Sequence, residues 1–217
     1  GGTIAAAADG GRFVWAPGDT GQPVVHSLGF GTTWTASTGV PANAIVASDR
    51  VNAKRFYAFS NGTFYTSTDG GSSFTATAAT GLPASNWNVT VKALPGGEGE
   101  IWVSGGATWT NYGLWRSTNG GATFTRVSTV EQADNIGFGK AAPGRTSPAL
   151  FTCARISGRR GVFRSDDTGR TWVRVNDDTH QWGAASAAIT GDPAIYGRVY
   201  LAGYGRGTLY GDRIPAP

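Results

Sequence analysis

The stretch that decides the fold runs from Ser67 to Phe74 and reads Ser-Thr-Asp-Gly-Gly-Ser-Ser-Phe. Two close copies follow at 117–124 and 165–172, and a degenerate copy lies upstream at 27–34, where Gly29 replaces the acidic residue. The first serines of successive copies are 40, 50 and 48 residues apart. A repeat of this period, with strand-like sequence between the copies, is typical of a β-propeller in which each repeat supplies one four-stranded blade.

Each copy has the composition of a tight turn between two strands. Its third residue, which is Asp69, Asn119 or Asp167 in the clear copies, can accept backbone N–H bonds across the turn, and the following glycines can adopt positive φ. The closing aromatic residue is expected to pack beneath the turn. Catalysis or calcium binding is the alternative role for these residues. We favour the structural role, because an active site is seldom repeated around a ring.

The composition fits an all-β protein and excludes several other classes. Glycine accounts for 34 of 217 residues without a Gly-X-Y period, which excludes collagen, and the 8 Trp, 7 Tyr and 10 Phe exclude an intrinsically disordered chain. One cysteine excludes a disulfide framework and a Cys-based zinc site. No apolar run approaches the ~20 residues of a membrane span. The net charge of +4 is scattered, so neither nucleic acid nor a membrane is predicted as a partner.

Strand and turn signals divide the chain into successive blades. We expect a partial blade at 1–40, complete blades at 41–84, 85–132 and 133–180, a partial blade at 181–212, and the start of a Pro-rich tail at 213–217. Cys153 falls within a strand and is interpreted as a small buried hydrophobe. The chain lacks an initiator Met and a signal-peptide pattern, so it reads as a piece of a longer chain. So few blades would not close a ring without leaving unpaired edges.

The repeated turn resembles the Asp box, S-x-D-x-G-x-[TS]-[WF], which sialidases, sortilin-type receptors and several glycoside hydrolases share. A narrower resemblance, to the end of the family 74 glycoside hydrolases or xyloglucanases, lies in the stretches 175–183, 189–200, 205–207 and 210–212. Further similar segments are Gly1–Ala6, 39–42, 56–58, 61–65 and 135–140. The resemblance therefore extends over essentially the whole chain.

The resemblance implies two seven-bladed propellers that enclose a cleft and cut the β-1,4-glucan backbone of xyloglucan with inversion. The present chain would be the C-terminal part, forming one wall of the cleft, with the N-terminal propeller as its partner. The two catalytic aspartates of the family lie in segments that precede the matched part, so no catalytic residue is expected here. Asp177 and Asp178 form an alternative pair. Neighbours on an extended segment point to opposite sides, however, so we favour turn-capping carboxylates.

Candidate substrate-binding residues lie in loops on the propeller face opposite the Asp boxes. Aromatic rings there would offer apolar platforms to sugar rings, and amide or imidazole groups could bond to hydroxyls. These residues are Trp87, Trp109, Tyr112, His180, Gln181, Trp182 and Tyr204. For the rings, packing between blades is the alternative. No cofactor is predicted, and a metal site at His180 is not favoured because one His without a nearby Cys is a poor ligand set.

The sequence therefore predicts part of a secreted, extracellular xyloglucanase acting on xyloglucan or a related β-glucan. Two glycosylation sequons, at 61–63 and 88–90, favour secretion. The alternative is a non-catalytic Asp-box propeller module that binds a glycan or a protein. A sialidase is a weaker alternative, because no arginine triad with a Tyr/Glu nucleophile pair can be assembled from this sequence.

Overall fold

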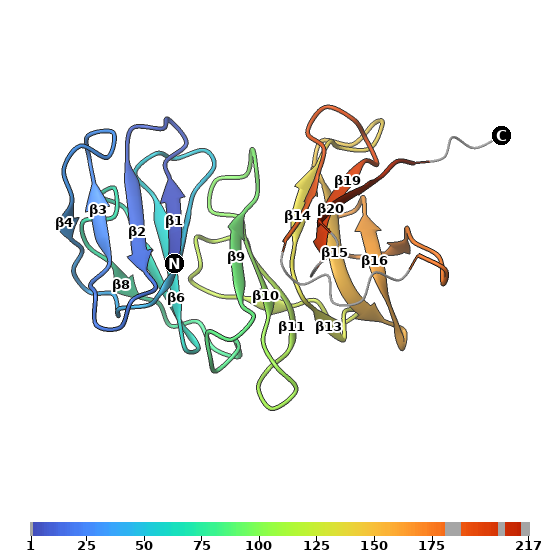
Figure 1. The fold of residues 1–217 in the computed structure, drawn as a ribbon, viewed down its shortest axis with the longest axis horizontal. Helices are drawn as coiled ribbons and strands as arrows, with labels where there is room; N and C mark the ends of the chain where they lie inside the picture. The colour runs from blue at the N-terminus through green and yellow to red at the C-terminus, as the bar shows by residue number, and fades with distance from the viewer. Residues whose placement is uncertain (1, 181–187, 204–206, 214–217) are drawn as a thin grey trace. The chain divides into compact units, whose positions relative to one another are not determined.

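A computed structural model describes residues 2–180, 188–203 and 207–213, and this part of the chain forms strands and turns without a helix. It accordingly contains no helix of the length and apolarity that crossing a membrane would need. The predicted all-β class is confirmed. The chain divides into two compact units, Gly1–Asn111 with Trp115–Thr125, and Tyr112–Leu114 with Arg126–Pro217. Figure 1 shows the ribbon and the strand labels.

The first unit contains two antiparallel sheets of four strands and most of a third. Within each sheet the strands follow one another in chain order, each hydrogen-bonded to the next. The first sheet comprises β1 (Gly2–Ala6), β2 (Phe13–Pro17), β3 (Val25–Ser27) and β4 (Thr35–Ala36). The second comprises β5 (Ile45–Ser48), β6 (Phe56–Ser60), β7 (Thr63–Ser67) and β8 (Thr75–Ala76), and the third β9 (Thr90–Ala93), β10 (Ile101–Gly105), β11 (Gly113–Ser117) and β12 (Thr125–Arg126).

The second unit contains two further sheets, and the long hairpin β15–β16 is the centre of the larger one. The fourth sheet has five strands because both β13 and β14 pair with β15. Its strands are β13 (Gln132–Ala133), β14 (Gly137–Gly139), β15 (Ala149–Ile156), β16 (Arg159–Ser165) and β17 (Val173–Arg174). The fifth sheet, over the described residues, has three strands, β18 (Ala188–Gly191), β19 (Val199–Gly203) and β20 (Gly207–Gly211).

The structure corrects the prediction of a partial blade at 1–40, because this segment forms a sheet of four strands. The pair β1–β2 holds five residues of each strand in register, from Gly2 opposite Pro17 to Ala6 opposite Phe13. The small residues of β1 are compatible with a strand close to its neighbours, but an Ala-rich run carries almost no period-2 signal. The strand was therefore hard to see in the sequence.

In the first unit the core lies between successive sheets. Small and aliphatic side chains of the first sheet, including Ala5, Val14 and Ala16, form one buried cluster with Phe56 and Ala58 of the second sheet. The opposite face of the second sheet forms another cluster with the third sheet. Its members include Tyr57, Phe59, Phe64, Val91, Ile101 and Val103. Alternation along each strand thus buries both faces of the second sheet, as the face-to-face packing of propeller blades requires.

In the second unit a smaller cluster joins the fourth and fifth sheets. It includes Phe151 and Val162 on one side and Ile189, Val199 and Leu201 on the other. Cys153 belongs to the same cluster and is 4% exposed, which confirms its interpretation as a buried hydrophobe. Burial, helped by the nearby charge of Asp134, raises the pKa of its thiol to about 12.

Candidate functional site

The Asp box at 67–74 folds as a closed turn that uses its carboxylate internally. The Ser67 hydroxyl donates to Asp69 Oδ1 at 2.8 Å and accepts the Gly71 N–H at 3.0 Å. Ser73 donates its N–H to Asp69 Oδ1 at 3.0 Å and its hydroxyl to Oδ2 at 2.5 Å. Partial burial opposes ionisation, but these bonds outweigh it and hold the pKa of Asp69 below its usual range. Both carboxylate oxygens are thus occupied within the turn.

The next two boxes repeat this geometry, one with an amide and the other again with a carboxylate. Asn119 Oδ1 accepts the Thr123 N–H at 3.0 Å, and its Nδ2 donates to Thr123 Oγ1 at 2.9 Å. Asp167 accepts both the N–H and the hydroxyl of Thr171, at 2.9 and 2.6 Å. Because an amide replaces a carboxylate without loss of the turn, the position needs an acceptor rather than a charge. Within the described ranges, no three His, Cys, Asp or Glu side chains form a group that could hold a metal ion.

A second repeated carboxylate, which the sequence reasoning missed, lies at Asp49 in the turn that follows β5. Asp49 is fully buried, and its Oδ1 accepts the N–H groups of Val51 and Asn52, both at 2.8 Å. Its Oδ2 accepts the Tyr57 hydroxyl at 2.6 Å and the Gly99 N–H at 2.8 Å. Gly99 belongs to the turn before β10, so this carboxylate links the second sheet to the third.

The equivalent residue in the fifth sheet is Asp192. Its Oδ1 accepts the N–H groups of Ala194 and Ile195, and its Oδ2 accepts the Tyr200 hydroxyl at 2.8 Å. The shared spacing of an Asp and a Tyr eight residues later, as in Asp49 and Tyr57, is the sequence signal that could have found the pair. Both carboxylates serve to shape turns.

Trp87 lies on a loop whose backbone is held by amide side chains. Asn86 Oδ1 accepts the Asn61 N–H at 2.8 Å, and Asn61 Oδ1 accepts the Asn86 N–H at 3.2 Å. Asn86 Nδ2 also donates to the Asn43 carbonyl at 3.0 Å. Above this fixed backbone the side chain of Trp87 is 64% exposed. An exposed indole on an ordered loop is an apolar platform of the kind that a sugar ring can cover.

Trp109 lies at the tip of a second loop, within a closed turn. The Thr110 N–H donates to the Ala107 carbonyl at 2.9 Å, and the Thr110 hydroxyl accepts the Ala107 N–H at 3.0 Å. Asn111 Nδ2 anchors the end of the loop by donating to the Gly81 carbonyl at 3.1 Å. The indole is 76% exposed, more than any other large apolar side chain in the described part of the first unit except Phe30.

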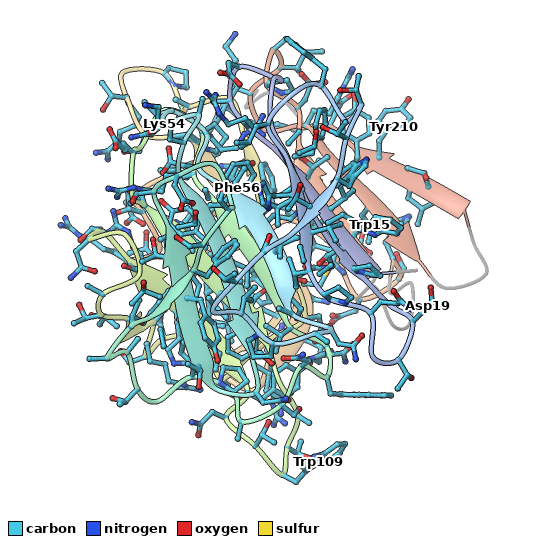
Figure 2. The ribbon with its side chains drawn as sticks, turned by 90° about the vertical axis from the view of Figure 1, so that its left-hand side faces the viewer. Trp15, Asp19, Lys54, Phe56, Trp109 and Tyr210 are labelled. Carbon is cyan, nitrogen blue, oxygen red and sulfur yellow. The ribbon has the colours of Figure 1, made fainter. Side chains whose placement is uncertain are left out.

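The loop of Trp109 starts beside the point where the loop of Trp87 ends. Gly105, where the second loop begins, lies so close to Asn88 that an added Cβ would overlap the Asn88 carbonyl. Figure 2 shows Trp109 at the opposite end of the first unit from Lys54, whose carbonyl accepts an N–H of the Asp box at 2.8 Å. The structure therefore brings these two predicted residues onto neighbouring loops, away from that box.

Tyr112 has a different environment, since its ring is half-buried and its hydroxyl is engaged within the protein. The hydroxyl donates to Asp134 Oδ1, and Asp134 Oδ2 accepts Arg160 Nη2 at 2.6 Å. Burial and the neighbouring carboxylate raise the pKa of Tyr112 to about 12. This tyrosine therefore already has a partner for its polar end, and a sugar contact would use only its ring.

His180 and the two adjacent aspartates form an exposed, self-contained turn. Asp177 Oδ1 accepts the N–H groups of Thr179 and His180, at 2.9 and 2.8 Å, and contacts His180 Nδ1 at 2.7 Å. Hydrogen bonds from Thr179 and His180 strongly lower the pKa of Asp177. Asp178 pairs instead with Arg174 at 2.6 Å. A general acid needs a raised pKa, so this pair has the wrong electrostatics for acid/base cleavage of a glycoside.

Three predicted residues, Gln181, Trp182 and Tyr204, lie outside the described residues. Of the seven candidates, the structure thus places Trp87 and Trp109 on adjacent loops of the first unit, and Tyr112 and His180 in separate polar environments of the second unit.

Comparison with known proteins gives no match to a family model. Individual proteins are nevertheless similar over nearly the whole chain. A xyloglucanase of Paenibacillus sp is 55% identical over 215 residues, which cover 99% of this chain and 20% of that protein. The xyloglucanase Xgh74A of Acetivibrio thermocellus is 50% identical over 212 residues, covering 98% of this chain and 24% of the relative.

A solved structure gives the same result. The family 74 xyloglucanase from Xanthomonas campestris superposes with a TM-score of 0.84 at 37% identity, covering 98% of this chain and 30% of that one. The sheets and turns thus define a β-propeller segment with Asp-box turns, similar in fold to part of this glycoside hydrolase. More narrowly, the chain is similar over nearly its whole length to enzymes of glycoside hydrolase family 74. It spans about a fifth to a quarter of the length of the curated relatives that it matches.

Proposed function

We propose that this chain is the C-terminal part of a xyloglucanase, in which it forms one wall of the cleft that binds the β-1,4-glucan backbone. The observation that carries the proposal is the 55% identity to a xyloglucanase along 99% of the chain. The exposed indoles of Trp87 and Trp109, on two neighbouring loops, support a role in binding sugar.

Under this proposal the chain is part of a longer protein, which we call the full-length polypeptide. The catalytic groups would come from another part of that polypeptide. Inverting hydrolysis uses a protonated carboxylic acid and a carboxylate base roughly 6.5–9.5 Å apart. Asp177 has a lowered pKa and Asp178 an arginine partner, so neither suits the acid. The family resemblance implies one catalytic aspartate in each propeller, and segments that precede this part of the polypeptide would supply both. We also propose that the protein is secreted and acts outside the cell.

The experiment is to incubate the full-length polypeptide with xyloglucan and to follow new reducing ends together with the anomeric proton signals. We expect hydrolysis in which the first product formed is the α-anomer, since inversion changes the configuration of a β-linkage. A double variant with Asn in place of Asp177 and Asp178 should still hydrolyse xyloglucan. Loss of all hydrolysis in that variant would place the catalytic acid or base in this chain and contradict the proposal.

A non-catalytic glycan-binding module is the second candidate. It is favoured by the environments of Asp177 and Asp178, neither of which suits a general acid. The reducing-end assay, together with electrophoresis in a gel that contains xyloglucan, separates the enzyme from the module. A module would be retarded by the xyloglucan in the gel but would form no new reducing ends.

A further inference from the structure

A polar cavity lies in the second unit beside the Asp box at 165–172. Its lining comes from two segments, that box and the loop that joins β14 to β15. The cavity has a volume of about 180 Å³. Since a water molecule occupies about 30 Å³ in the liquid, this is room for about six waters or for one small polar molecule.

Two arginines that line the cavity, Arg145 and Arg170, have uncommitted guanidinium groups. Both residues are exposed, and within the described ranges neither side chain makes an ion pair or a hydrogen bond. They come from different segments, Arg145 from the loop and Arg170 from the box. A guanidinium presents paired N–H donors whose spacing matches the two oxygens of a carboxylate. The two side chains therefore favour an anionic group in the cavity.

Two carboxylates, Asp166 and Asp167, line the same cavity and limit the charge of that group. Asp167 is bonded to Thr171 within its turn. Asp166 Oδ2 accepts Arg164 Nε at 3.1 Å and the Tyr196 hydroxyl at 2.9 Å. Asp166 Oδ1 is buried and has no hydrogen-bond partner in the ranges that the structure describes. Negative charge at the wall repels a phosphate, which is close to a dianion at pH 7, more than it repels a singly charged carboxylate.

The box beside the cavity departs from the two preceding boxes at positions that line it. Arg170 occupies the sixth position of the box, where the copies at 67–74 and 117–124 have Ser and Ala. Thr168 occupies the fourth position, where both of those copies have Gly. The φ of Thr168 is +60°, a left-handed conformation that is unfavourable for a β-branched residue. Backbone strain of this kind is concentrated at functional sites, where the surrounding structure maintains it.

We propose that this cavity binds a small sugar acid, that is, a polyhydroxylated molecule with one carboxylate. Arg145 and Arg170 would bind the carboxylate. The hydroxyls of Thr146, Ser147 and Thr168, which also line the cavity, would bond to the hydroxyl groups of the ligand. The box begins at the end of β16 opposite the tip of the β15–β16 hairpin, so the cavity is separate from the environment of Tyr112. The inference goes beyond the proposed function and does not depend on it.

The test is saturation-transfer NMR of the full-length polypeptide, titrated separately with D-glucuronate and with D-glucose. We expect glucuronate to bind, and glucose, which lacks the carboxylate, to bind at least about tenfold more weakly. Inorganic phosphate, added as a competitor, should displace glucuronate only at concentrations above that of glucuronate itself. Absence of glucuronate binding, equal binding of glucose, or stronger competition by phosphate would each overturn the proposal.

Variants locate the binding in this cavity. The double variant Arg145→Gln/Arg170→Gln should raise the Kd for glucuronate about tenfold. The matched control Arg50→Gln/Arg159→Gln removes the same charge from exposed positions outside the cavity and should leave the Kd unchanged. Melting temperatures of both double variants check that they fold. An unchanged Kd in the cavity variant, or an equal rise in both, would contradict the proposal.

Thr168→Gly distinguishes a binding role of this residue from a structural one. It removes a hydroxyl from the cavity and relieves the backbone strain, as in the boxes that have Gly at this position. We expect the Kd for glucuronate to rise about threefold while the melting temperature does not fall. A lower melting temperature with an unchanged Kd would contradict the assignment. None of these measurements involves hydrolysis, so a failure here is distinct from a failure of the proposed function.

Discussion

At the scale of single residues, Asp49 joins the turn after β5 to the turn before β10. Its buried carboxylate accepts four hydrogen bonds, from Val51, Asn52, Tyr57 and Gly99. Burial favours the neutral acid, yet these bonds prevail and lower its pKa. The same carboxylate, together with burial, strongly raises the pKa of Tyr57.

Replacing Asp49 with Ala should therefore destabilise the protein by about 3 kcal/mol, because it leaves several buried donors without a partner. Urea unfolding of the full-length polypeptide, followed by tryptophan fluorescence, measures this loss. Asp192→Ala is the matched control, since Asp192 has the same turn and tyrosine bonds but lies near the surface. An equal loss of unfolding free energy in both variants would mean that the hydrogen bond between Asp49 and Gly99 does not contribute to stability.

The box carboxylates predict how stability depends on pH. The pKa values of Asp69 and Asp167 are lowered in the folded state, so their contribution is complete above the unfolded-state pKa of about 4. It is lost as the pH falls through the lower folded-state values. Asp69→Asn copies the natural Asn119 box and should cost less than about 1 kcal/mol at pH 7.

Below pH 4 the Asp69→Asn variant should lose stability less steeply than the parent, because one titrating carboxylate has been removed. Melting temperatures measured from pH 7 to pH 2 test this expectation. If the melting temperatures of variant and parent fell in parallel as the pH was lowered, the pKa of Asp69 would be the same in the folded and unfolded states.

At the scale of elements, the boxes at 67–74 and 117–124 each contain a glycine that lies against the neighbouring sheet, Gly71 against Val14 and Gly121 against Phe64. Gly121 has a φ of +85°, and an added Cβ would overlap the Phe64 ring. Gly81 has a similar φ of +77°, but an added Cβ there would meet nothing within 4 Å. Gly81→Ala should cost about 1 kcal/mol through backbone strain alone.

Gly121→Ala should cost at least about 2 kcal/mol more than Gly81→Ala, since it adds a clash in a packed core to the same backbone strain. Thermal unfolding of the two variants side by side measures the difference. Equal melting temperatures would mean that the second and third sheets can move apart to accept a methyl group. That result would contradict the close contact between Gly121 and the Phe64 ring.

The sequence predicts the local parts of these elements well and the non-local parts poorly. The boxes and their hairpins are encoded by neighbouring residues, and the prediction that Cys153 lies buried within a strand is confirmed. By contrast, β14 begins only at Gly137, because Asn135 Oδ1 accepts the Cys153 N–H and interrupts the edge of β15. The hydrogen bond between Asp49 and Gly99 joins residues 50 positions apart in the sequence, so no local pattern predicts it.

The same division holds for the candidate site. The exposure of Trp87 and Trp109 follows from loop positions that the strand pattern fixes. The hydroxyl bond of Tyr112 to Asp134 depends on a partner 22 residues away, and local composition does not encode it.

At the scale of the whole molecule, the chain is one surface of a larger enzyme under the proposal, and its contribution is to binding. Trp87 and Trp109 are expected to stack on the glucan backbone, with each ring contributing about 1 kcal/mol. Such contacts would be present equally in the bound substrate and in the transition state. Their loss should therefore raise KM and leave kcat unchanged.

Trp109→Ala in the full-length polypeptide should raise KM for xyloglucan roughly fivefold, which corresponds to about 1 kcal/mol of binding free energy. Trp109→Phe keeps an aromatic platform and should recover most of that loss. Val173→Ala removes an exposed apolar side chain of β17 and is the control for a general surface effect. Initial rates over a range of xyloglucan concentrations give both constants. A fall in kcat with unchanged KM would mean that Trp109 acts at the transition state, and no change in either would remove this loop from the cleft.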